Sequence, residues 1–234
     1  MTPDGIVDQG VDLGYSDELR RKAAPIWQME QRHPFVTGIG DGTLPLENFQ
    51  YYMRQDFIFL VGFCRAIALA AAKATGLEEM SWFARLLHET LNTEMALHVS
   101  FCADFGISEQ ELRATEASPT TLAYTNHLVH TAYSGGTGEI AAVILPCSWG
   151  YCEIGQTLAS RGAPSPQPLY ARWIEMYASD EFAELAAWLR SYVDRTALES
   201  SPDELARMER AFLRGSQLEY MFWDAAYRLE EWPV

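Results

Sequence analysis

The amino-acid sequence predicts an all-α fold, and three observations support this prediction. Apolar residues recur at three- and four-residue steps along most of the chain, which is the spacing that gives a helix one buried face. Capping residues, prolines and glycines separate these stretches where helices begin and end. No stretch shows the apolar and polar alternation of a half-buried strand. We therefore expect a compact multi-helix bundle.

The first part of the chain predicts a tail, one bent helix and a connector. Residues 1–15 are rich in Gly and Asp and are expected to form a flexible tail, followed by a single domain over 16–234. Ser16 is a candidate cap for a helix that Pro25 bends. In the segment 33–45, glycines recur at every second position, which favours a tight connector. A phosphate-binding loop is less well supported, because no strand precedes the segment and it lacks lysine.

Further helices are predicted wherever an apolar pattern lies between start and stop signals. The clearest starts are Ser118-Pro119, a cap followed by proline, and Ser201-Pro202-Asp203-Glu204, a capping box. The expected ranges are about 46–74, 78–105, 118–135, 139–161, 169–178, 181–198 and 201–230.

The segment 144–155 is the most informative one, because it is apolar enough to be buried yet carries a thiol, a phenol and a carboxylate. In a helix, Cys147 and Tyr151 share one face, whereas Cys152 points about 140° away from Cys147. Pro146 is expected to kink this helix. These residues alone also fit a packed helix with an inert, buried cysteine.

Composition argues against several classes of protein. The chain carries 17 Lys and Arg against 32 Asp and Glu, a net charge of -15, which repels nucleic acid and anionic membranes. Its four cysteines lack the spacing of a zinc site or a disulfide scaffold, which favours a reducing compartment. No apolar run is expected to span a membrane and no signal peptide is recognised, so we expect a cytoplasmic protein.

Four blocks of sequence occur in a specific order between about Ile26 and Trp232. The blocks are His33-Pro-Phe-Val-Thr-Gly-Ile-Gly-Asp-Gly-Thr-Leu-Pro45, Gln55-Asp56, Leu145-Pro-Cys-Ser-Trp-Gly-Tyr-Cys-Glu-Ile-Gly155 and Glu219-Tyr-Met-Phe-Trp223. Together they resemble the TenA family of thiaminase II enzymes. The resemblance implies a heme-oxygenase-like helical bundle and a homotetramer. It also implies cofactor-free hydrolysis of aminopyrimidines released from degraded thiamin, or of thiamin itself.

The resemblance also implies roles for individual residues. Cys147 is the nucleophile, Glu219 is the acid/base that protonates the pyrimidine ring, and Asp56 holds the amino group of the ring. Phe59 stands where the family commonly has tyrosine, so one pocket hydroxyl is missing. The other expected substrate-binding residues are Tyr124, Tyr151, Tyr177 and Phe222, of which Phe222 packs on the ring face.

This chemistry suits an aminopyrimidine, which is a poor electrophile until one ring nitrogen is protonated. In an aromatic pocket the pKa of Glu219 should rise, which keeps the acid protonated near neutral pH. No His or Lys lies within a turn of Cys147 to lower its pKa. Transfer of the thiol proton to a pocket group during attack is therefore as good a hypothesis as a resting thiolate.

Alternatives remain open at this point. Asp56 also fits a buried partner for an arginine or a helix end, and each tyrosine fits an ordinary core residue. A metal-dependent oxidase is a second hypothesis, since Glu94 and His98 lie four residues apart on one helix face. His88, Glu89, His127 and His130 are its further candidate ligands. A regulator that binds a pyrimidine without turnover is the third.

Overall fold

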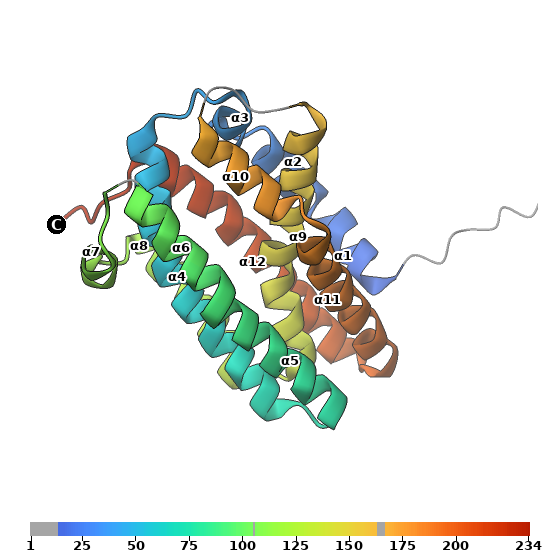
Figure 1. Ribbon diagram of the computed structural model, residues 1–234. Coiled ribbons are helices and arrows are strands. Elements are labelled where there is room, and N and C mark those ends of the chain that lie inside the picture. The colour runs from blue at the N-terminus through green and yellow to red at the C-terminus, as the bar shows by residue number, and fades with distance from the viewer. Residues whose placement is uncertain (1–13, 105, 163–166) are drawn as a thin grey trace, which may run out of the picture.

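The computed structural model describes residues 14–104, 106–162 and 167–234. Every regular element in this part of the chain is a helix, so the all-α prediction is confirmed (Figure 1). The predicted tail lies outside the described residues up to position 13, as does Phe105, the predicted end of one helix.

The elements follow the predicted order, with additional short helices. They are α1 (Tyr15–Lys22), α2 (Ala24–Gln31), α3 (Pro34–Asp41), α4 (Leu46–Lys73), α5 (Leu77–Glu89), the π-helical segment η1 (Thr90–Glu94), α6 (Met95–Asp104), α7 (Glu109–Ala114), α8 (Pro119–Ser134), α9 (Thr137–Ser160), α10 (Pro168–Tyr177), α11 (Asp180–Glu199) and α12 (Pro202–Arg228).

Helix α9 is the central element of the bundle. It packs against α12, α11 and α10, while α4 packs against α8 and α5 on the other side (Figure 1). Most residues of α9 are buried, and Pro146 lies inside it as predicted. The capping serines before α8 and α12 are also as predicted, since each accepts a hydrogen bond from a backbone N–H in the first turn.

Helix α4 is long and apolar enough to cross a membrane by composition alone, with a mean hydropathy of 1.6 over 18 residues. This differs from the expectation that no run reaches that length. However, 61% of that window is buried inside the protein. Its apolar composition is therefore accounted for by packing in the core.

The segment 33–45 is not a connector, so that prediction was wrong. His33 Nδ1 accepts a hydrogen bond from the Phe35 N–H, and Pro34 begins helix α3. A Cβ atom at Gly40 would lie 2.7 Å from Leu158 Cδ2. This glycine permits close helix packing, and Gly42 ends the helix with a φ of 70°.

Three other features differ from the sequence predictions. Helix α1 begins at Tyr15, and Ser16 is not its cap, since the Ser16 N–H donates to Asp194 Oδ1 at 2.6 Å. The helical run after Leu77 changes to π-helix over Thr90–Glu94. The short helix α7, which a capping box at Ser108 begins, was not expected.

Candidate functional site

Cys147 and Glu219 come together where α12 crosses α9 most closely. A Cβ atom at Gly215 would lie 3.0 Å from the Val143 carbonyl oxygen and 3.1 Å from Pro146 Cγ. The absence of a side chain therefore lets the two helices approach each other. Glu219 lies one turn after Gly215, which brings its carboxyl group to the thiol of Cys147, with which it shares a hydrogen bond.

Glu219 is 3% exposed and accepts hydrogen bonds from two groups. The phenol of Tyr124 donates to Glu219 Oε1 at 2.5 Å, and the Cys147 thiol donates as well. Burial raises the pKa of Glu219 to about 7, and these two hydrogen bonds act in the opposite direction. A carboxyl group with such a pKa is suited to accept and return a proton near neutral pH.

The surroundings of the Cys147 thiol favour its protonated form. Burial raises its pKa well above the ordinary range, and the neighbouring carboxyl groups of Glu219, Glu94 and Asp56 raise it further. The described groups that act most strongly on this thiol include no cation. Of the two hypotheses from the sequence, the geometry therefore favours transfer of the thiol proton during attack over a resting thiolate.

Asp56 of α4 lies in the same buried region, and within the described part of the chain no arginine pairs with it. Burial raises its pKa well above the ordinary range, as do Glu94 and Glu219, while a hydrogen bond from Tyr52 opposes them. His98 Nδ1 is 3.6 Å from Asp56 Oδ2. Burial lowers the pKa of His98 to about 4, so this ring is neutral at neutral pH and supplies no positive charge beside Asp56.

Aromatic rings surround these polar groups. The ring of Phe59 lies 4.8 Å from that of Tyr124 and 5.8 Å from that of Phe222. The rings of Tyr151 and Tyr177 are 4.8 Å apart. Predicted pocket residues on α4, α8 and α12 therefore contact one another, as do those on α9 and α10.

A narrow inner cavity lies among them. Of the predicted site residues, Asp56, Phe59, Cys147, Tyr151 and Tyr177 line it, whereas Tyr124, Glu219 and Phe222 lie behind this wall. Its open volume is about 20 Å³, which is room for about one water molecule. A pyrimidine ring therefore enters only if side chains of the wall move.

Two further spaces adjoin the inner cavity. A second cavity shares Asp56, Glu94 and Tyr177 with it. An outer groove of about 610 Å³, between α5 with η1 and α11, shares Thr90, Glu94, Phe182 and Leu185. These four side chains separate the inner cavity from the surface.

Sequence reasoning missed two residues of this site. Tyr52 is fully buried and shares hydrogen bonds with Tyr151 and Tyr177, and its position one turn before Asp56 was the available signal. Glu94 was considered only as a metal ligand. Its place in the cavity depends on the π-helical segment, which the apolar spacing does not reveal.

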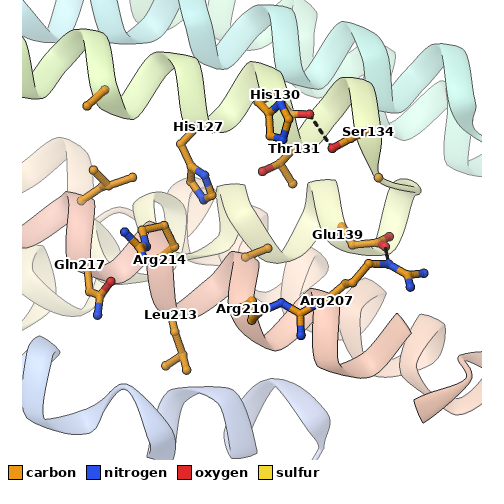
Figure 2. A pocket seen from close by; sticks show the side chains of 14 residues that line it. His127, His130, Thr131, Ser134, Glu139, Arg207, Arg210, Leu213, Arg214 and Gln217 are labelled. Atoms are coloured by element: carbon orange, nitrogen blue, oxygen red, sulfur yellow. Dashed lines mark hydrogen bonds and ion pairs between the residues drawn. The ribbon is translucent and has the colours of Figure 1, made fainter. Parts of the chain in front are cut away.

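The side chains that the metal hypothesis would combine do not gather. His127 and His130 lie on α8 and face Arg207, Arg210 and Arg214 of α12 in a separate cleft (Figure 2). Among the described residues, no group of three or more His, Cys, Asp or Glu has the arrangement of a metal site. That combination of ligands was therefore wrong.

Comparison with known proteins gives a consistent result. The model of the TENA/THI-4/PQQC family matches residues 20–229. A protein of Halalkalibacterium halodurans named aminopyrimidine aminohydrolase is 44% identical over 220 residues, covering 94% of this chain and 98% of that protein. The Bacillus subtilis protein of the same name is 38% identical and covers 94% and 92% of the two chains.

Solved structures extend the comparison to the fold. The TenA homologue of P. horikoshii superimposes with a TM-score of 0.86 and 32% identity, over 92% of this chain and 99% of that chain. A domain from Shewanella denitrificans, described as having a heme oxygenase-like fold, gives a TM-score of 0.71 at 13% identity, over 91% and 92% of the chains. The expected heme-oxygenase-like bundle is therefore confirmed.

Proposed function

Because the chain belongs to the TENA/THI-4/PQQC family, we propose that it is a hydrolase of aminopyrimidines in thiamin salvage. The substrate is 4-amino-5-aminomethyl-2-methylpyrimidine, and the product is its 5-hydroxymethyl counterpart. One observation carries the mechanism. The protonated thiol of Cys147 donates a hydrogen bond to Glu219, and the pKa of Glu219 is raised by burial to about 7.

The first step joins the enzyme to the ring. Ionised Glu219 takes the proton of the Cys147 thiol while the sulfur forms a bond to a ring carbon. The movement of the wall that admits the ring also exposes Glu219 to it. The same proton then passes from Glu219 to a ring nitrogen, which takes up the electron pair displaced by the sulfur. Glu219 is unchanged at the end of this step, and Tyr124 holds its carboxyl group in place.

The second step releases the substituent from the exocyclic methylene group. Electrons from the amino group of the ring expel the leaving group together with its bonding pair. Positive charge grows on that amino nitrogen, where the carboxyl group of Asp56 accepts its hydrogen bonds and stabilises the charge. Water then adds to the methylene carbon, and expulsion of Cys147 restores the aromatic ring and the thiol proton.

The aromatic side chains position the ring for both steps. Phe59 offers a ring face for stacking, and Phe222 packs against Phe59 from behind the wall. Tyr151 and Tyr177 place hydroxyl groups beside the inner cavity. Thiamin is the second candidate substrate. The outer groove next to the inner cavity favours it, because a bulky leaving group finds room there.

Assembly and location complete the proposal. A homotetramer is what the family resemblance implies, and the cytoplasm is the location expected from the sequence. Large apolar side chains at the surface, including Leu77, Tyr133 and Leu198, support association between copies, since each is at least 70% exposed. Light scattering on the purified protein measures the number of copies.

The decisive experiment incubates the wild type and the Cys147→Ala variant with each substrate and follows the hydroxymethyl product. The wild type should form it, and Cys147→Ala should lose activity by a factor of about 10⁴ or more while keeping its fold. Cys152→Ala is the matched control, since this cysteine lies on the same helix but does not line the inner cavity. Absence of product with the wild type would refute the proposal.

A further inference from the structure

Glu94 is an acidic residue of the site that has no role in the steps above. It is the one described residue that lines the inner cavity, the second cavity and the outer groove together. Its carboxyl group therefore lies at the junction where a group leaving the inner cavity must pass. It ends the π-helical segment Thr90–Glu94, and such segments often occur at functional sites.

We propose that the Glu94 carboxylate binds the ammonium group of the aminomethyl substrate and then takes a proton from the water that replaces it. This inference rests on the proposed function and adds a second catalytic acid/base to the site. It also reassigns a side chain that the sequence suggested as a metal ligand.

The surroundings of Glu94 favour a cationic ligand. Within residues 14–104, 106–162 and 167–234 its carboxylate has no hydrogen-bond or ion-pair partner. The titratable groups that line the two cavities with it are Tyr52 and Asp56 of α4, His98 of α6, Cys147 and Tyr151 of α9 and Tyr177 of α10. The thiol of Cys64 on α4 also lies close enough for Glu94 to raise its pKa. None of these is a cation at neutral pH, because burial lowers the pKa of His98 to about 4.

One positively charged side chain lines the outer groove, and it already contacts an aromatic ring. The guanidinium group of Arg85 lies 4.4 Å from the centre of the Trp82 ring. The other charged side chains of the groove are Glu89, Glu181 and Glu184. Burial raises the pKa of Glu94 itself to about 7, which suits a group that must give and accept a proton near neutral pH.

The chemistry balances with Glu94 in this role. A primary amine is protonated at neutral pH, as the lysine side chain is, so the substrate carries a CH2–NH3⁺ group. The C–N bond breaks and ammonia leaves with the electron pair. Water then gives a proton to the Glu94 carboxylate as its oxygen bonds to the methylene carbon. Protonated Glu94 returns that proton to ammonia, which departs as ammonium.

The test uses Glu94→Gln, Glu94→Ala and the wild type, with Glu78→Gln as the control. Glu78 is exposed on the same helical run and lines none of the three spaces. Glu94→Gln should lower kcat for the aminomethyl substrate about 100-fold, and formate should restore part of the activity of Glu94→Ala. Below pH 6 the slope of log kcat against pH should be about 2 in the wild type and about 1 in Glu94→Gln. The wild type needs both Glu219 and Glu94 ionised, and the variant has lost one of these two ionisations.

Binding in the Cys147→Ala background separates the two roles of Glu94. By calorimetry, Glu94→Gln should weaken binding of the aminomethyl compound about tenfold and leave binding of the neutral hydroxymethyl product unchanged. The inference is overturned if Glu94→Gln keeps more than half of the wild-type kcat, or if formate restores nothing and the pH slope stays the same. If the wild type forms no product, the proposed function fails first, and this inference fails with it.

Discussion

The phenol of Tyr124 donates a hydrogen bond of 2.5 Å to Glu219 Oε1, although the two residues are 95 positions apart in the chain. Tyr124 comes from α8 and Glu219 from α12, so the bond ties together two helices next to the site. A charged acceptor makes such a bond stronger than a neutral one does. The bond therefore stabilises the ionised form of Glu219, the form that accepts the thiol proton.

Tyr124→Phe should shift the pH dependence of the reaction. The hydrogen bond from Tyr124 lowers the pKa of Glu219, so its loss should raise that pKa above 7. The acidic limb of the kcat profile should move up by about one pH unit, and kcat at pH 7 should fall roughly fivefold. Steady-state kinetics between pH 5 and 9 measures both effects.

Tyr170→Phe is the control for this substitution. The Tyr170 hydroxyl is buried and donates to the Leu44 carbonyl oxygen, but it lies outside the inner cavity. Its loss should leave the pH profile unchanged. An unshifted profile for Tyr124→Phe would show that Tyr124 does not govern the ionisation of Glu219.

Glu219→Gln should stabilise the protein at alkaline pH. Burial raises the pKa of Glu219 from 4.5 to about 7, so its contribution to stability is fully present below pH 4.5 and is lost as the pH rises through 7. The ionised form costs roughly 3 kcal/mol. The substitution should therefore raise the free energy of unfolding by up to about 3 kcal/mol more at pH 8 than at pH 5.

Urea denaturation at the two pH values measures this difference. Glutamine keeps an oxygen that accepts the Tyr124 hydrogen bond, so packing changes little. An equal effect at both pH values would mean that the pKa of Glu219 is not raised in the folded protein. Activity should be lost at either pH, which is the stability–activity trade-off expected of a catalytic acid.

Cys147 should react slowly with iodoacetamide. Burial raises the pKa of the thiol well above its ordinary range, so little thiolate is present at pH 8. We expect alkylation at least about tenfold slower than that of free cysteine, with a rate that still increases above pH 9. Mass spectrometry of the peptide that contains Cys147 measures this rate.

The variant Cys147→Ala supplies the background in this experiment. Cys64, Cys102 and Cys152 are buried, so they should contribute little. A rate that levels off near pH 7 would demonstrate a resting thiolate and would contradict the proposed transfer of the thiol proton to Glu219.

Sequence patterns predict the features of this fold that neighbouring residues determine. The helices that begin after Ser118 and Ser201 were predictable, because a capping residue acts within a few positions of itself. Helix α3 was not, because Gly40 looks like a turn signal until Leu158 of another helix is placed against it. A contact between distant segments leaves no local pattern.

The same distinction applies to the candidate site. Helical spacing alone placed Cys147 and Tyr151 on one face, and both line the inner cavity. The expectation that Cys147 and Glu219 lie close together rested on the family resemblance. Helical spacing could not predict it, because the close approach at Gly215 depends on how α12 packs on α9. The position of Glu94 was missed, since it depends on one π-helical turn.

Replacement by alanine should have opposite effects on stability at two glycines of α9. A Cβ atom at Gly155 would lie 2.6 Å from the Tyr177 carbonyl carbon and 2.8 Å from the Ala178 nitrogen, both of which are backbone atoms. Gly155→Ala must therefore displace the end of α10 and with it Tyr177. We expect a loss of about 1–3 kcal/mol in stability and a lower kcat.

Gly150→Ala is the matched control in the same helix. The nearest heavy atom to its added Cβ is Glu30 Oε2 at 3.9 Å, an ordinary contact. Alanine favours a helix interior over glycine by roughly 0.5–1 kcal/mol, so this variant should be equally or more stable. Thermal unfolding and kcat of both variants test the pair. Equal stabilities would show that α10 does not lie against Gly155, and the placement of Tyr177 beside the inner cavity would then be wrong.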